Sequence, residues 1–270
     1  MTYLGTNGYQ LENSGHSILI DPYFSRISLA RIGFRLPIQP DKSRIERGMS
    51  RLNRDVDAIL VTHAHFDHLL DAPVLMRETG AKLVGSTTAV ALANRAGGDR
   101  AKCAPVKPGD VLSIGRWRIA VLPAAHDRLP LAGVPFNGAL RKSGPPVRAS
   151  DWVCGEPLSY LITIEGHRIF IDSGGTPEAL PSINTGPVDL AILGVALTDS
   201  RQRFAAAVRR LRPRFVLPSH QDDFFEPLDR GFKFGSLTDF EFVMREHKEQ
   251  RLPGRLILMD YFRPWTLPPS

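Results

Sequence analysis

Short apolar runs recur along the chain and predict its β-strands. Several are nearly continuous in Ile, Leu and Val, as in the run from Ala58 to Val61. Such runs are typical of strands buried on both faces of a sheet. The pattern predicts strands over residues 17–20, 58–62, 82–85, 117–122, 159–164, 168–172, 190–193, 215–218 and 255–259.

Helical periodicities lie between these runs. Residues 87–96 are rich in Ala and precede Gly97 and Gly98, which favours helix termination there. Phe204, Val208 and Leu211 fall on one face of a helix over residues 201–214, and residues 237–247 are also amphipathic. Strands pair locally and then alternate with helices, twice over. This order predicts an α/β protein, an αββα sandwich with the sheets inside and the helices outside.

Two stretches show little periodicity and predict long loops. Residues 24–53 are rich in Arg and Pro, and residues 127–157 combine Gly, Pro and Arg. Loops of this length in a compact domain are usually functional or mobile. No Pro-, Ser- or Gly-rich linker separates two cores, so we expect a single domain over residues 1–270.

Composition narrows the class of protein without giving its function. With 43% hydrophobic and 23% charged residues, the 270-residue chain is close to the soluble globular average, which excludes a disordered or collagen-like protein. The 34 basic and 28 acidic residues leave a net charge of +6. That excess is modest for this length and does not by itself indicate nucleic acid.

Cysteine usage and the N-terminus favour a cytoplasmic protein. Cys103 and Cys154 are the only cysteines, too few for a disulfide framework, which indicates a reducing compartment. The first residues lack the basic and apolar regions of a signal peptide. No apolar run approaches the roughly 18 residues that a membrane-spanning helix needs, so we expect no membrane span.

The most informative pattern is Thr62-His63-Ala64-His65-Phe66-Asp67-His68, which follows an apolar strand directly. A strand that ends in a turn spreads these side chains around a small volume. Neutral imidazoles and a carboxylate are ligands of a borderline divalent ion such as zinc. The pattern therefore predicts a metal site at the end of this strand.

Two further histidines have the same placement. His126 follows the strand predicted over 117–122, and His220 follows the strand predicted over 215–218. In open α/β sheets, binding sites lie at the carboxyl ends of strands. We therefore expect His126 and His220 to join the His-rich cluster.

Together these motifs resemble the metallo-β-lactamase-fold hydrolases over nearly the whole chain. The resemblance begins with YLGTNGYQLENSGHSILIDPYF, similar to the family's opening hairpin and Asp-Pro turn, and continues through THAHFDH, His126, IFIDSGGT and His220. It is closer to the ascorbate-phosphate lactonase and N-acyl-phosphatidylethanolamine phospholipase branches than to true β-lactamases. It implies two mixed β-sheets face to face, with helices on the outer faces.

The resemblance also implies one or two divalent metal ions, with Zn expected first and Mn or Fe as alternatives. The first metal would be held by His63, His65 and His126. The second would be held by Asp67, His68 and His220. In the family, an Asp in a Gly-Asp-Thr turn usually bridges both metals.

The chain departs from the family at this bridging Asp. If Gly174-Gly175-Thr176 is matched to Gly-Asp-Thr, Gly175 replaces the carboxylate. If the strand ends one turn earlier, Asp172 reaches the metals instead, and we favour Asp172 as a ligand or near-ligand. The alternative is that Asp172 caps the turn. Loss of the bridge would weaken the second site, so a single metal is also consistent with the sequence.

The expected chemistry is hydrolysis by a metal-activated hydroxide, because a bound metal brings the pKa of water towards neutrality. Asp67 would orient the water and His126 would assist proton transfer, so both are predicted catalytic residues. Metal-bound histidines usually donate their other N–H to a carboxylate or carbonyl. Asp21 and Asp222 are the predicted partners of this kind.

The predicted substrate is a small molecule with a phosphodiester, lactone or other ester bond. Arg128, Arg141 and Arg148 in the second long loop favour an anionic substrate, because guanidinium groups bind phosphate and carboxylate in pairs of hydrogen bonds. One alternative is a nuclease of the same superfamily, although no dense basic tail supports nucleic-acid binding. Another is a metal-poor binding protein, and a homo-oligomer is compatible with the sequence.

Overall fold

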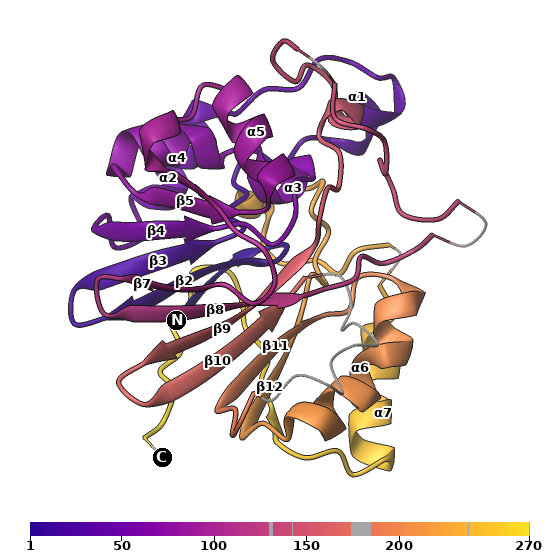
Figure 1. Ribbon diagram of the computed structural model, residues 1–270. Helices are drawn as coiled ribbons and strands as arrows, with labels where there is room; N and C mark the ends of the chain where they lie inside the picture. Colours follow the sequence, from indigo (N-terminus) through magenta and orange to yellow (C-terminus); the bar gives the residue numbers. More distant parts are fainter. Residues whose placement is uncertain (130–131, 142, 174–184, 237, 270) are drawn as a thin grey trace.

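Two β-sheets lie face to face, and helices cover the outer face of each (Figure 1). The computed structural model describes residues 1–129, 132–141, 143–173, 185–236 and 238–269. The predicted αββα sandwich is therefore confirmed. Within the described chain, no helix combines the length and the apolar character needed to cross a membrane.

The first sheet is six-stranded, in the order β1-β2-β3-β4-β5-β6. Its strands are β1 (Thr2–Gly5), β2 (Gly8–Asn13), β3 (His16–Ile20), β4 (Val56–Leu60), β5 (Lys82–Gly85) and β6 (Cys103–Pro105). The strands from β1 to β3 pair antiparallel, and those from β3 to β6 pair parallel.

The second sheet is seven-stranded, in the order β13-β12-β11-β10-β9-β8-β7. Its strands are β7 (Val111–Ile114), β8 (Trp117–Pro123), β9 (Leu158–Ile164), β10 (His167–Asp172), β11 (Leu190–Gly194), β12 (Phe215–Ser219) and β13 (Arg255–Leu256). Because β9 is antiparallel to both β8 and β10, while β10 to β13 pair parallel, the strands β8, β10 and β12 end at one edge of the sheet.

Helices complete the outer layers. In Figure 1, α2, α4 and α5 cover the first sheet, and α6 and α7 cover the second. The helices are α1 (Leu29–Gly33), α2 (Lys42–Met49), α3 (Phe66–Leu69), α4 (Ala72–Thr79), α5 (Thr87–Arg95), α6 (Thr198–Leu211) and α7 (Phe240–Glu249).

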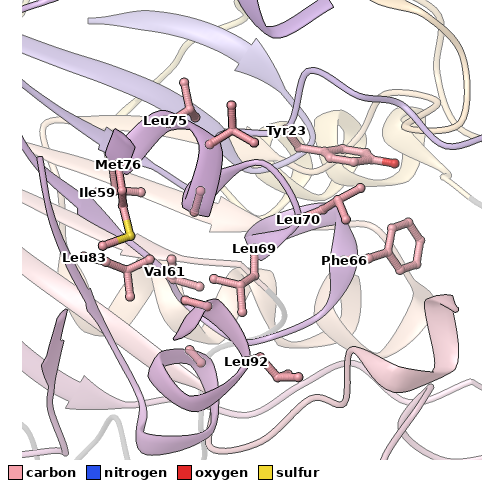
Figure 2. Packing of buried hydrophobic residues seen from close by; sticks show 14 of the residues in the cluster. Tyr23, Ile59, Val61, Phe66, Leu69, Leu70, Leu75, Met76, Leu83 and Leu92 are labelled. Atoms are coloured by element: carbon pink, nitrogen blue, oxygen red, sulfur yellow. The ribbon is translucent and has the colours of Figure 1, made fainter. Parts of the chain in front are cut away.

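Strand alternation produces three buried layers. On β4, Ile59 faces the helices of the first sheet, where it packs with Leu69, Leu75 and Leu83 (Figure 2). Its neighbour Leu60 faces the space between the sheets. The third layer lies between the second sheet and α6. Both faces of the central strands are thus covered, which explains their continuous apolar sequences.

The segment 24–53, predicted as one long loop, contains two short helices. The side chain of Ser28 accepts a hydrogen bond from the backbone of Arg31 at the start of α1. Asp41 accepts one from the backbone of Arg44 at the start of α2. These N-caps satisfy backbone N–H donors that have no partner inside the helix. The helices are short and rich in Arg, so the apolar periodicity that would predict them is weak. The described part of segment 127–157 includes a short 3-10 helix, Ala149–Asp151.

Candidate metal centre

Strand ends bring the predicted site residues together. Asp21 follows β3, His63 follows β4, His126 follows β8 and His220 follows β12. His65 is the N-cap of α3, and this short helix carries Asp67 and His68. The two sheets therefore contribute to one site.

The ligand atoms form two groups of three, each within 4.8 Å. One group consists of His63, His65 and His126. The other consists of Asp67, His68 and His220. The rings of His63 and His68 join the groups, because their centroids are 3.9 Å apart.

The backbone is strained at two of these positions. Asp21 has φ 42° and His220 has φ 56°, both in the left-handed region that a non-glycine residue seldom adopts. Strain of this kind persists only where surrounding contacts hold it, and it is concentrated at functional sites. The backbone N–H of His220 donates to the carbonyl of Thr6, which anchors the strained turn to the first hairpin.

Hydrogen bonds determine which nitrogen of His65 is available to a metal. Nε2 lies 2.9 Å from the carbonyl oxygen of Pro135, which only accepts, so Nε2 carries the proton. Its Nδ1 is left with a lone pair and lies 3.0 Å from Nε2 of His63. On His126, Nδ1 lies 2.7 Å from the carbonyl oxygen of Asp127, which leaves Nε2 with the lone pair.

Carboxylates surround His68 on both sides. Its Nδ1 lies 2.9 Å from Oδ2 of Asp21. This contact is compatible with the predicted role of Asp21 as the partner of a metal-bound histidine, which stays a prediction. Its Nε2 lies 3.2 Å from Oδ2 of Asp67, and the same oxygen is 3.3 Å from Nε2 of His220. One carboxylate oxygen thus lies between two imidazoles.

Burial lowers the pKa of three histidines in the site, whereas neighbouring carboxylates raise the pKa of His68. Burial lowers the pKa of His63 well below its ordinary value, that of His65 to about 3 and that of His126 to about 4. Burial also disfavours a charged His68, but Asp67 and Asp21 outweigh it and raise its pKa to about 10. Asp67 keeps a lowered pKa despite its burial because His68 and His220 lie beside it.

The donor set fits a borderline divalent ion. Neutral imidazoles and a carboxylate are the ligands zinc takes, and iron or manganese bind similar sets. In addition, Nδ1 of His220 is buried without a hydrogen-bond partner among the described residues. A cation would satisfy lone pairs that otherwise face one another.

Asp172 lies outside both groups of ligands. It pairs with Leu193 in parallel register, and Leu193 packs in the layer that contains α6, as does Phe170. Alternation therefore places Asp172 on the helix-facing side of β10. Its role as a ligand stays a prediction, and Gly175, the alternative position, lies outside the described residues.

Asp222 pairs with an arginine. Its carboxylate accepts hydrogen bonds from Arg26 (2.8 Å), Tyr3 (3.0 Å), Tyr261 (2.6 Å) and the backbone of Thr6 (2.7 Å). This buried network holds the loop after β12 against the first hairpin, so Asp222 supports the turn of His220 through its backbone. No local sequence pattern links Arg26 to Asp222, because 196 positions separate the two residues.

A cavity of about 270 Å³ opens over the two groups of ligands. Its apolar wall is formed by Ile32, Phe66, Leu129, Pro135, Phe136, Ala196, Leu197, Phe224 and Phe225. The ring of Phe224 lies 5.2 Å from that of His220. None of its described lining residues is Lys or Arg.

The three arginines predicted to bind substrate are exposed and do not line this cavity. Arg141 lies 3.4 Å from Asp151, and the backbone of Arg148 donates to the same carboxylate. Their substrate-binding role stays a prediction. Sequence reasoning missed Ser173, which lines the cavity.

Comparison with known proteins agrees with this architecture. The family model described as "Beta-lactamase superfamily domain" matches residues 16–221, which include all six residues of the two groups. The chain belongs to the beta-lactamase superfamily. The resemblance to metallo-β-lactamase-fold hydrolases is thus confirmed.

Relatives in this superfamily carry the name UPF0173 metal-dependent hydrolase. One from Thermococcus kodakarensis is 30% identical over 226 residues, which cover 81% of this chain and 82% of the relative. One from Methanopyrus kandleri is 24% identical over 265 residues, or 96% of each chain. The structure of the metallo hydrolase Igni18 from Ignicoccus hospitalis has the same fold, with TM-score 0.63 and 20% identity over 96% of this chain and 93% of that one.

Proposed function

We propose that this superfamily member is a metal-dependent hydrolase of small, uncharged esters or lactones. The observation that carries the proposal is the position of the two ligand groups at the floor of an apolar cavity. The named relatives are metal-dependent hydrolases, which supports the reaction class.

Each group of ligands would hold one divalent ion. When bound, such an ion supplies Lewis acidity and lowers the pKa of coordinated water towards neutrality. His65 and His126 each direct one proton to a backbone carbonyl, which keeps their other nitrogens as electron-pair donors. Because Nδ1 of His126 lies against a backbone carbonyl, we favour His126 as a metal ligand over a role in proton transfer. Asp67, which lies in the cavity wall, would orient the water.

The apolar wall favours an uncharged acyl substrate over an anion. Phe66, Phe136, Phe224 and Phe225 would bury an apolar chain or ring, while the described wall offers no cation to a phosphate or carboxylate. The expected small anionic substrate depends on exposed arginines outside this wall. A carbonyl ester or lactone therefore fits the cavity better than a phosphodiester.

The test combines metal content with activity on four compounds. These are a neutral p-nitrophenyl ester, an N-acyl homoserine lactone, bis-p-nitrophenyl phosphate and a β-lactam. We expect bound metal and turnover of the ester or lactone in preference to the phosphodiester, and loss of all turnover in His65→Ala.

Three results would contradict the proposal. Less than one equivalent of metal in protein purified without chelator would favour a binding protein. Activity that persists in His65→Ala would place the chemistry elsewhere. RNA cleavage, with binding that falls steeply as salt rises, would favour the nuclease.

A further inference from the structure

We propose that Ser173 and Thr62 are positioning residues that, through Asp21, connect the two halves of the metal centre. Ser173 follows β10 in the second sheet, and Thr62 follows β4 in the first. The hydroxyl oxygens of Thr62 and Ser173 are 2.8 Å apart, so the contact crosses between the sheets. This inference rests on the proposed metal centre but not on its reaction.

The directions of the hydrogen bonds follow from what each group can donate. Oγ1 of Thr62 lies 2.5 Å from Oδ2 of Asp21, and an ionised carboxylate only accepts. The single hydroxyl proton of Thr62 therefore belongs to Asp21. Ser173 must then donate its own proton to Thr62, which leaves the oxygen of Ser173 as an acceptor.

The acceptor on Ser173 receives the proton of His63. Oγ of Ser173 lies 3.2 Å from Nδ1 of His63, slightly nearer than Oγ1 of Thr62 at 3.3 Å, and Nδ1 of His68 donates directly to Asp21 at 2.9 Å. The chain of hydrogen bonds therefore runs from His63 through both hydroxyls to the carboxylate, and from the other side His68 reaches the same carboxylate.

This chain fixes the same tautomer on both histidines. With Nδ1 of both histidines directed to this chain, Nε2 is the atom that each would offer to a metal, one in each group of ligands. On His68 the metal would displace the Nε2 proton that Asp67 stabilises. Both hydroxyls are buried, and the amide of Asn7 and the backbone N–H of Thr62 also bond to Asp21. A carboxylate held at four points shifts little, so the orientation of one histidine is transmitted to the other.

The two hydroxyls should therefore affect different numbers of metal ions. Removal of Ser173 takes the nearer acceptor from His63 alone, whereas removal of the Thr62 hydroxyl breaks the chain to His63 and also takes one donor from Asp21. Loss of partners that orient ligands typically weakens metal binding about 10- to 100-fold.

The experiment measures zinc binding to the full chain by competition with a chromogenic chelator. The variants are Ser173→Ala, Thr62→Val and Thr62→Ser. The matched control is Ser17→Ala, which removes an equally buried hydroxyl bonded to the carbonyl of Asp55 and the amide of Gln10, on the opposite end of β3 from Asp21. Thermal unfolding of each zinc-free variant reports stability separately.

We expect Ser173→Ala to weaken one equivalent of zinc about 10- to 100-fold and Thr62→Val to weaken both. Thr62→Ser should restore wild-type affinity, and Ser17→Ala should alter unfolding alone. The inference is overturned if Ser173→Ala and Thr62→Val bind zinc like the wild type, if Thr62→Ser fails to restore binding, or if Ser17→Ala weakens binding equally. A wild-type chain that takes up no zinc, manganese or iron would overturn the metal centre and the proposed function as well.

Discussion

The ion pair between Arg26 and Asp222 gives the most quantitative prediction. Both side chains are fully buried, and the charged atoms are 2.8 Å apart. Removal of one partner from such a pair leaves an uncompensated buried charge and typically costs about 3–5 kcal/mol. We therefore expect Arg26→Met and Asp222→Asn each to lose about 3–5 kcal/mol of unfolding free energy at pH 7, a large part of the roughly 5–15 kcal/mol of an ordinary domain.

The two variants should respond differently to acid. Burial alone would raise the pKa of Asp222, but Arg26 and Tyr261 outweigh burial and hold it below its ordinary value. Wild-type Asp222 therefore contributes stability above the unfolded-state pKa, and this is lost only as pH falls through the lower folded value. In Arg26→Met the arginine no longer offsets burial, so the pKa of Asp222 rises and its carboxyl takes up a proton as pH falls.

The deficit of Arg26→Met should consequently shrink between pH 7 and about pH 4, near the pKa of an unfolded Asp. Asp222→Asn should show no such relief, because a guanidinium stays charged at every accessible pH. The double variant should lose less than the sum of the single variants, since it buries no unpaired charge.

Urea denaturation of the three variants between pH 4 and pH 7 measures these differences. The reasoning fails if the deficit of Arg26→Met is independent of pH, or if the two single losses simply add. Either result would show that the pair is solvated, or that the neighbouring tyrosines carry the stability.

Three further results are expected. Gly5 has φ +87°, and a Cβ at this position would lie 1.6 Å from the buried guanidinium of Arg26. Gly5→Ala should therefore destabilise the protein more than Gly15→Ala, where φ is +83° and a Cβ would meet nothing within 4 Å. Equal losses of stability in urea denaturation would contradict the clash. Phe224→Ala should raise KM for a neutral aromatic ester about tenfold, or ~1.4 kcal/mol, because Phe224 lines the cavity. Phe234→Ala, at an exposed position, should leave KM unchanged. An unchanged KM in Phe224→Ala would show that this ring does not contact the substrate. Zinc at 100 times its Kd should stabilise the wild type by about 2.7 kcal/mol and His65→Ala by clearly less, and equal shifts in thermal unfolding would argue against His65 as a ligand.

Much of the fold could be predicted because its central strands are buried on both faces. The run from Ala58 to Leu60 supplies apolar side chains to two different layers, so the strand is apparent without periodicity. The short strand Cys103–Pro105 and the half-exposed strand Val111–Ile114 were missed, because neither has a continuous apolar run.

The site was predictable in the part that is local in sequence. His63, His65, Asp67 and His68 follow one strand, so their proximity needs no knowledge of the tertiary structure. The partner of Asp222 could not be found in this way. Its arginine lies in a loop of the opposite sheet, and its pairing also requires a glycine at position 5 to leave room.

The end of β10 shows that the chemistry of a residue does not by itself give the side of the strand on which it lies. A carboxylate is the better metal ligand, so the sequence favours Asp172 over the serine that follows it. Alternation places Ile171 between the sheets and Asp172 with Phe170 on the helix-facing side, so the next inward position is Ser173. It is Ser173 whose oxygen lies beside His63, across from β4. Alternation along this strand therefore brings a hydroxyl beside His63. Metal binding by Asp172 stays a prediction, and an unchanged zinc stoichiometry in Asp172→Ala would show that Asp172 is not a ligand.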